Sequence, residues 1–328
     1  MNNITLKPFS REYTEKVVDL WNKNAACKTI YAELTVEEFK DKFYNNPNYK
    51  DEGSILAFDG DLLVGFGNAI YYLDSNPETS PAYISMIVVE ESYQRHGIGT
   101  MILKSLENYL RSEGRKYIRN YFGCPINLKW YVPGYYKHEH LGAPAVPYNT
   151  PIYYLFLANN YYSDGQQDGF HIDLTKFTMP EVVVNKIKEN EKDGYTITMY
   201  DEKLHHGFDE MFDALQNEGF RRTVHRVLEN DRHAKIVIAQ KDGEILGFTG
   251  PVKTEPTGRG SLGGVAIHPK AQKRGLGKTM FCYLCLKSKE NGAKFMTLFT
   301  GSENRARNIY LHAGLKIVQS FNIMRKEL

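Results

Sequence analysis

The sequence has few cysteines, no long apolar run and no excess of charge of either sign. Only 4 of its 328 residues are cysteine, and their scattered positions suit neither a disulfide framework nor a paired zinc site. No window approaches the roughly 18 consecutive apolar residues of a membrane span, and the first residues lack a charged region followed by an apolar one. We therefore expect a cytoplasmic protein with no membrane partner and no metal.

The charge balance also bears on the class of partner. The chain carries 41 basic and 39 acidic residues, a formal net charge of +2, so no global field gathers nucleic acid. Apolar residues make up 42% and charged residues 24% of the chain, which is typical of folded rather than disordered protein. The length predicts about two domains.

The chain contains an internal repeat. Gln94–Gly99 and Gln272–Gly277 share the pattern Gln-x-x-Gly-x-Gly. The same offset in residue number pairs apolar residues before the two patterns. After the patterns it pairs a leucine with a leucine and one Gly-x-Lys segment with another. Upstream of each copy, a segment with Asp59-Gly60 or Asp242-Gly243 as its turn is typical of a β-hairpin. We therefore predict two copies of one domain, residues 1–176 and 177–328, with a strand over 170–174 ending the first.

Hydrophobic periodicity and turn signals predict the elements of the second copy. Its strands are expected at 195–200, 235–239, 245–251, 261–267, 295–299 and 315–323. Its helices are expected at 181–192, 208–218, 222–229, 276–290 and 306–312. Such an order predicts an α/β (α+β) fold, with a mixed sheet and helices on both faces.

The repeated glycine pattern lies between a strand and a helix. There, unpaired backbone N–H groups point in one direction at the positive end of the helix dipole, which favours an anion. Glycine alone is a weak signal, since a tight turn without a ligand is the commoner explanation of such a pair. The sequence lacks the first glycine of a P-loop at the required spacing. Ile102 and Met280 occupy the positions where a dinucleotide-binding fold needs its third glycine, so neither nucleotide-binding motif fits.

Two motifs in order resemble the GNAT superfamily of acyl-CoA-dependent N-acetyltransferases. The segment 265–277 is similar to that family's strand and pyrophosphate loop, and 306–315 is similar to its later Ala-x-x-x-Tyr-x-x-x-Gly-Phe segment, with Leu315 in the phenylalanine place. The resemblance covers nearly the whole chain as a tandem pair, an arrangement similar to mycothiol synthases. It implies two tandem GNAT-like domains, each with a mixed, splayed sheet.

The resemblance also implies site residues and acetyl-CoA as co-substrate. Tyr310 would protonate the departing thiolate, and backbone N–H groups near Val265–Ile267 would polarise the acetyl carbonyl. The residues expected to bind acetyl-CoA are Val265, Ala266, Ile267, Gln272, Lys273, Arg274, Gly275, Leu276, Gly277, Lys278 and Asn304 in the second copy, and Gln94, Arg95, His96, Gly97, Ile98, Gly99 and Thr100 in the first.

The expected function is transfer of an acetyl group to a primary amine of a small molecule by direct attack in a ternary complex, in a monomer or homodimer. We expect the chemistry in the second copy, because the first has Phe156 in the tyrosine place and Asn160-Tyr161 in place of Gly-Phe. Two alternatives stay open: acetylation of a protein or peptide amine, and a non-catalytic acyl-CoA sensor. Glu244, Glu255 and His268 are weighed as general base, and none is assigned.

Two further features have a structural and a functional interpretation. The stretch 122–150 is rich in proline and aromatic residues, and its length indicates either an interface between the copies, which we favour, or a lid over an acceptor pocket. Cys282 and Cys285 fall on one face of the predicted helix 276–290. We expect core packing there rather than redox or metal chemistry.

Overall fold

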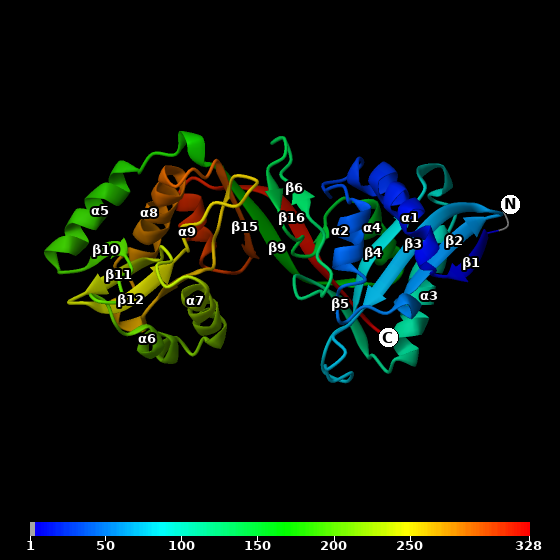
Figure 1. Cartoon of the computed structure of the whole chain (residues 1–328), viewed down its shortest axis with the longest axis horizontal. Coiled ribbons are helices and arrows are strands. Elements are labelled where there is room, and N and C mark those ends of the chain that lie inside the picture. The colour runs from blue at the N-terminus through cyan, green and yellow to red at the C-terminus, as the bar shows by residue number, and fades with distance from the viewer. Residues whose placement is uncertain (1–3) are drawn as a thin grey trace. The chain divides into compact units, whose positions relative to one another are not determined.

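The computed structural model describes residues 4–328 and divides the chain into two compact units. The N-terminal unit comprises the residues up to Gly169 together with Gln319–Leu328, and the C-terminal unit comprises Phe170–Val318 (Figure 1). The first residues of the chain are predicted to lack a leader, and residues 1–3 of that segment lie outside the described residues. Among residues 4–328, no helix has the length and apolar character needed to cross a membrane.

The N-terminal unit contains a four-stranded antiparallel sheet with helices on both faces. Its strands follow the order β1 (Ile4–Pro8), β2 (Ser54–Asp59), β3 (Leu62–Ile70), β4 (Tyr83–Val89). Side chains alternate between the two faces, so Leu56 and Phe58 belong to one buried cluster and Ala57 to another. The first cluster includes α1 (Thr14–Trp21) and α2 (Val36–Lys42), and the second includes α3 (Ile98–Ser112) and α4 (Pro151–Ala158).

The N-terminal unit is completed by residues from the end of the chain. β16 (Lys316–Glu327) enters this unit at residue 319, and its last residues pair antiparallel with β5 (Tyr117–Asn120). Phe321 and Asn322 of β16 pair with β8 (Val146–Pro147). The strands β6 (Trp130–Tyr131) and β7 (Glu139–His140) form a small separate ribbon.

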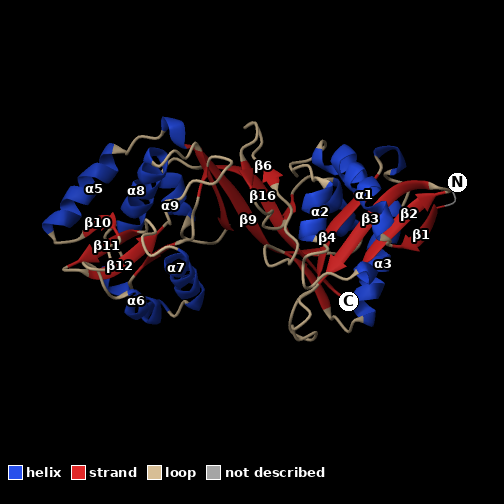
Figure 2. Cartoon of the chain, viewed as in Figure 1, coloured by secondary structure: helices blue, strands red, loops and turns tan. Residues whose placement is uncertain are grey.

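The C-terminal unit has the same plan, as Figure 2 shows. Its antiparallel sheet has the order β10 (Thr196–Met199), β11 (Val237–Lys241), β12 (Glu244–Thr249), β14 (Val265–Ile267), while β13 (Arg259–Gly260) pairs in parallel with β15 (Phe295–Gly301). The helices are α5 (Glu181–Lys192), α6 (Phe208–Leu215), α7 (Glu218–Asn230), α8 (Leu276–Glu290) and α9 (Arg307–His312). The expected mixed α/β fold with two similar domains is confirmed.

Several local predictions need correction. The strand expected over 261–267 begins only at Val265, because Gly264 has φ +136° and interrupts the extended backbone. The strand expected over 170–174 is the end of β9 (Tyr162–Asp173), and the last strand continues to Glu327. Asp242-Gly243 forms the turn of the second hairpin as expected. In the first hairpin Asp59 pairs with Leu62, so the turn is Gly60-Asp61.

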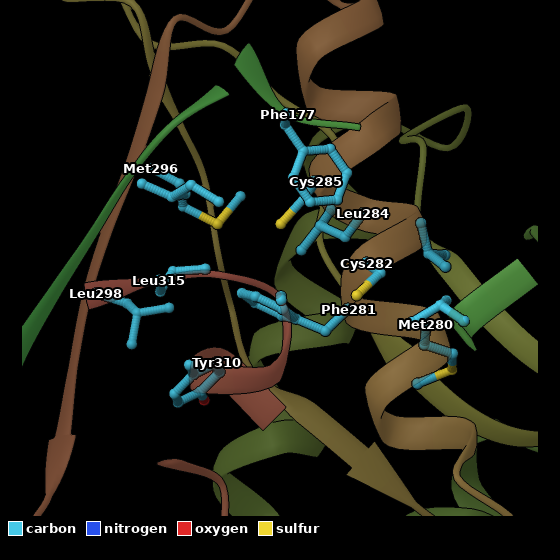
Figure 3. Packing of buried hydrophobic residues seen from close by; sticks show 14 of the residues in the cluster. Phe177, Met280, Phe281, Cys282, Leu284, Cys285, Met296, Leu298, Tyr310 and Leu315 are labelled. Atoms are coloured by element: carbon cyan, nitrogen blue, oxygen red, sulfur yellow. The ribbon is translucent and has the colours of Figure 1, made fainter. Parts of the chain in front are cut away.

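The two cysteines of α8 lie in the core. Cys282 and Cys285 have no exposed surface and pack in the main apolar cluster of the C-terminal unit (Figure 3). Burial raises the pKa of Cys282 to about 12 and also raises the pKa of Cys285. Both side chains are neutral apolar packing groups, which confirms the prediction of core packing.

Candidate functional site

The two glycine loops have the same unusual backbone conformation. Lys273 and Gly275 have φ of 65° and 76°, and the equivalent Arg95 and Gly97 have φ of 64° and 84°. A lysine or arginine in the left-handed region is uncommon, so its occurrence at matching positions marks a specific loop shape. Alternation of left-handed and right-handed residues turns successive backbone N–H groups toward one point, which is a cradle for an anion.

The shape shared by the two loops is held in each case by the side chain of the glutamine. The Gln94 side chain donates from Nε2 to the Val89 carbonyl at 3.0 Å, and Gln272 donates to the Ile267 carbonyl at 3.3 Å. Each glutamine therefore ties its loop to the last residue of the strand before it. Its side chain positions the loop, and the N–H groups of the following helix turn remain for a ligand.

A groove of about 530 Å³ lies beside the loop of the N-terminal unit. It runs from β4 over the loop to α4, and a Cβ added at Gly99 would lie 3.4 Å from Leu155 in its wall. Arg95 and Thr100 also line it, whereas the Ile98 side chain turns into the core. His96 is exposed. The groove therefore gathers most of the cofactor residues expected in the first copy.

The loop of the C-terminal unit is packed more closely by neighbouring helices. A Cβ added at Gly277 would lie 3.1 Å from Ile309 of α9. Arg274 donates to Asp193 at 2.9 Å and covers the Tyr195 ring, so its side chain faces the end of α5. Lys278 lines a hollow beside α5 together with His312. Lys273 is exposed and Leu276 is buried in the core.

The other residues expected to bind the co-substrate lie on β14 and in the turn before α9. Val265 and Ile267 are half-buried on β14 and Ala266 is buried. Asn304 donates from its amide to Thr300 at 2.8 Å and accepts from the Ala306 N–H at 2.9 Å. The Asn304 side chain therefore shapes the turn before α9.

Tyr310 projects from α9 into the apolar cluster of the C-terminal unit. Its ring lies 5.0 Å from that of Phe281 and 5.6 Å from that of Phe170, and Figure 3 shows it at one end of the cluster. Burial raises its pKa to about 12. Within residues 4–328 the hydroxyl has no hydrogen-bond partner, so a neutral donor is available at physiological pH.

The candidates weighed as a general base are largely engaged elsewhere. Glu255 forms an ion pair with Arg259 at 2.7 Å, and Glu244 is paired with Lys270. His268 accepts a hydrogen bond at Nδ1 from the Lys270 N–H, and burial together with the Lys270 charge lowers its pKa. His268 is therefore a neutral side chain at pH 7 with its proton on Nε2.

The sequence interpretation missed a polar residue where two strands of the N-terminal unit separate. The Asn120 side chain accepts from the Ile84 N–H at 2.9 Å at the end of β5, and its own amide nitrogen is buried without a partner among the described residues. Nothing in the local pattern singles out Asn120, because its role depends on the pairing of β5 with residues near the end of the chain.

A model of the acetyltransferase (GNAT) family matches residues 17–123 and 198–315. No curated protein matches the chain. Among solved structures, a protein described as GCN5-related N-acetyltransferase from Sphaerobacter thermophilus has TM-score 0.61 and 13% identity, covering 100% of this chain and 96% of its own. A tandem GNAT protein from the clavulanic acid biosynthesis pathway has TM-score 0.57 and 15% identity, covering 99% and 98%.

A further similar structure is the glucosamine N-acetyltransferase region of a fungal multi-domain GH3 β-N-acetylglucosaminidase. Its TM-score is 0.69 and its identity 15%, over 99% of this chain. The present chain spans only 38% of that fungal chain. At these identities the neighbours support the fold.

Proposed function

Because the chain belongs to the acetyltransferase (GNAT) family, we propose that it transfers an acetyl group from acetyl-CoA to a primary amine of a small molecule. The observation that carries the proposal is the paired loop shape, with positive φ at Arg95 and Gly97 and again at Lys273 and Gly275. Each loop opens a 15-residue helix, α3 or α8. An anionic pyrophosphate suits the N–H groups and helix dipole there.

The cradle residues fit a phosphate group. A Cβ at Gly97 would meet nothing within 4 Å, so this side of the loop is open, while a Cβ at Gly99 or Gly277 would press against Leu155 or Ile309. Any side chain at Gly99 or Gly277 would therefore crowd the wall beside the loop. Arg95 and Lys273 add positive charge at the equivalent position of each loop. When bound, acetyl-CoA supplies the acyl group as a thioester.

We place the chemistry in the C-terminal unit, where Tyr310 is available. Backbone N–H groups of β14 donate to the acyl oxygen as negative charge develops on it. The neutral amine forms the new C–N bond, the C–S bond breaks, and the Tyr310 hydroxyl donates its proton to the departing sulfur. The amine loses one proton to water, because Glu244 and Glu255 are held in ion pairs. A proton from water then restores the Tyr310 hydroxyl.

A second candidate function is a non-catalytic acyl-CoA sensor. It is favoured by Phe156, which occupies in α4 the place that Tyr310 has in α9 and so leaves the N-terminal loop without this acid. A sensor keeps binding at both loops and is indifferent to the Tyr310 hydroxyl. Turnover therefore separates the two functions, and binding alone does not.

Calorimetric titration with acetyl-CoA tests the proposal, together with a turnover assay over small amines and peptides. Glucosamine belongs in the amine panel, since a similar structure is described as acting on it. We expect two sites, one lost in Gly99→Glu and the other in Gly277→Glu, because a carboxylate in the cradle repels phosphate. Ser92→Glu, an exposed change just before the first loop, serves as the control. No binding to the native chain would overturn the proposal.

A further inference from the structure

Helix α5 lies beside the glycine loop of the C-terminal unit and holds one of its carbonyl groups. The Asn190 side chain is buried, only 4% exposed, and its Nδ2 donates to the Arg274 carbonyl at 3.2 Å. A Cβ added at Gly275 would lie 3.4 Å from the side chain of Lys186, one turn earlier on the same helix. The loop backbone at Arg274 and Gly275 therefore packs against α5.

The C-terminal end of α5 is itself fixed to the rest of its unit. The Tyr195 N–H donates to the Asn190 carbonyl at 2.9 Å. The Lys241 ammonium donates to the Asp193 carbonyl, also at 2.9 Å. Arg274 adds a contact from the loop, because its guanidinium donates to the Asp193 carboxylate at 2.9 Å and covers the Tyr195 ring. Asn190 is therefore held where its amide reaches the loop.

The bond from Asn190 sets the direction of the next N–H group in the loop. The peptide bond between Arg274 and Gly275 is trans, so its carbonyl and its N–H point in opposite directions. Because the carbonyl is turned to α5, the Gly275 N–H points away from α5. Within residues 4–328 this N–H has no hydrogen-bond partner, so it is one of the donors that the loop offers to an anion.

The glycine at position 275 makes this peptide free to turn over unless a bond holds it. Glycine adopts positive and negative φ about equally readily, so the plane between Arg274 and Gly275 can flip at little steric cost. The flipped plane would present the carbonyl oxygen where the N–H now points, and a carbonyl oxygen repels phosphate. The bond from Asn190 opposes the flip, because the flip would leave a buried amide without its acceptor.

The glycine loop of the N-terminal unit has no corresponding bond. His96 occupies the place of Arg274, and no side chain within residues 4–328 donates to the His96 carbonyl. Gly97 has φ +84°, close to the +76° of Gly275, and a Cβ there would meet nothing within 4 Å. The first loop therefore has the same shape without the support of a neighbouring helix, and the two loops serve as a comparison within one chain.

We infer that Asn190 is a positioning residue for the C-terminal cofactor loop, which fixes the Arg274–Gly275 peptide so that the Gly275 N–H faces the pyrophosphate of acyl-CoA. The inference rests on the proposed binding of acyl-CoA at the two glycine loops. A donor that is already oriented loses less freedom when the ligand binds, so the bond strengthens binding. The N-terminal loop does not depend on Asn190.

The test is calorimetry with acetyl-CoA and with free CoA on the full chain, with each loop measured alone. Gly99→Glu leaves the C-terminal site, and Gly277→Glu leaves the N-terminal site. In the Gly99→Glu background, Asn190→Leu should weaken both probes by the same factor of about ten, the ratio for one hydrogen bond. The factors are equal because the two probes share the pyrophosphate. In the Gly277→Glu background, Asn190→Leu should change neither affinity.

A control variant and a kinetic measurement separate positioning of the loop from a general effect on the unit. Asn230→Leu removes another amide-to-carbonyl bond, to Arg226 at 2.8 Å in α7 of the same unit, and should leave both affinities unchanged. In turnover with a reactive amine, Asn190→Leu should raise the KM for acetyl-CoA about tenfold and leave kcat unchanged, because the loop binds the cofactor and the reacting atoms are the same.

Unchanged affinity of the C-terminal site in Asn190→Leu would overturn the inference and leave the proposed function standing. An equal loss in Asn230→Leu, or a fall in kcat without a rise in KM, would overturn it as well. Absence of binding to the native chain would overturn the proposed function itself. Should Asn190→Leu fail to fold, as judged by thermal unfolding, Asn190→Ser decides by the same comparison, since its hydroxyl is too short to reach the Arg274 carbonyl.

Discussion

Lys326 of β16 places its ammonium nitrogen 2.8 Å and 2.9 Å from the two carboxylate oxygens of Glu107 on α3. The Glu107 side chain is 3% exposed, so this is a buried ion pair. The Lys326 ammonium also covers the Tyr161 ring. The pair fixes the last strand against the helix that begins at the first glycine loop.

Lys326→Met should lower the free energy of unfolding by about 2 kcal/mol, because it leaves the buried Glu107 carboxylate without its main partner. We expect a smaller loss than is usual for a broken buried ion pair, because Arg111 lies 3.6 Å from Glu107 and remains as a second partner. Denaturant unfolding measures this loss of free energy. The double variant Lys326→Met with Glu107→Leu removes both charges and should recover most of the loss; a double variant as unstable as the single one would contradict this account.

Tyr310→Phe should lower kcat about a hundredfold with little change in acetyl-CoA affinity, because only the proton donor is removed. The raised pKa of Tyr310, about 12, keeps the hydroxyl protonated, so its ionisation causes no loss of rate below about pH 10. Steady-state kinetics from pH 6 to 10 check both statements. Tyr283→Phe on α8 is the matched control, and equal rates for the two variants would refute the acid role.

Stability should fall in acid through Glu113. Its hydrogen bond from Tyr71 and its ion pair with Lys50, at 3.0 Å, lower its pKa below the ordinary 4.5. A carboxyl with a lowered folded pKa adds stability above the unfolded value, and the gain disappears as pH falls through the folded pKa. Between pH 7 and pH 3, the free energy of unfolding should therefore fall less in Glu113→Gln than in the native chain. Glu37→Gln, at a more exposed pair with Lys40, should leave the profile of the native chain unchanged.

Thiol reactivity should separate the four cysteines by burial. Cys27 is exposed, whereas Cys282 and Cys285 are buried with raised pKa values and Cys124 is partly covered. A thiol reagent at pH 8 should label Cys27 rapidly and the α8 pair only after denaturation, because the thiolate is the reactive form. Cys27→Ser should lose the fast phase. Rapid native labelling of Cys282 would contradict the packing of α8.

Local signals in the sequence predicted much of the fold. The 3.6-residue periodicity of 276–290 and the glycine before it predict α8 with its bounds, and the two Asp-Gly segments predict two hairpins. The site loops follow from the same local pattern, since their shape is set within six residues. The sequence places each glutamine in its loop, but it does not reveal the hydrogen bond from the glutamine side chain to the preceding strand.

Long-range pairing was beyond what the sequence predicts. The pairing of Met324 with Asn120 joins segments far apart in the chain, and the periodicity of either strand is compatible with many partners. The stretch 122–150 illustrates the same limit. We favoured an interface for it. In the structure Trp130 packs on Phe321, and a cavity of about 70 Å³ beside Asn120 is lined by Cys124, residues 126–128, Ala143, Ala145 and Val146. These contacts lie within the N-terminal unit, so the interface stays a prediction.

The contribution of β16 to the N-terminal unit has a consequence for synthesis. A nascent chain that has reached residue 318 has made the C-terminal unit and still lacks the strand that pairs with β5. Until residues 319–327 leave the ribosome, the open edge of β5 has no partner and the carboxylate of Glu107 lacks the Lys326 ammonium. The unit translated first is therefore the unit completed last, and a stalled chain exposes an unpaired strand edge to aggregation.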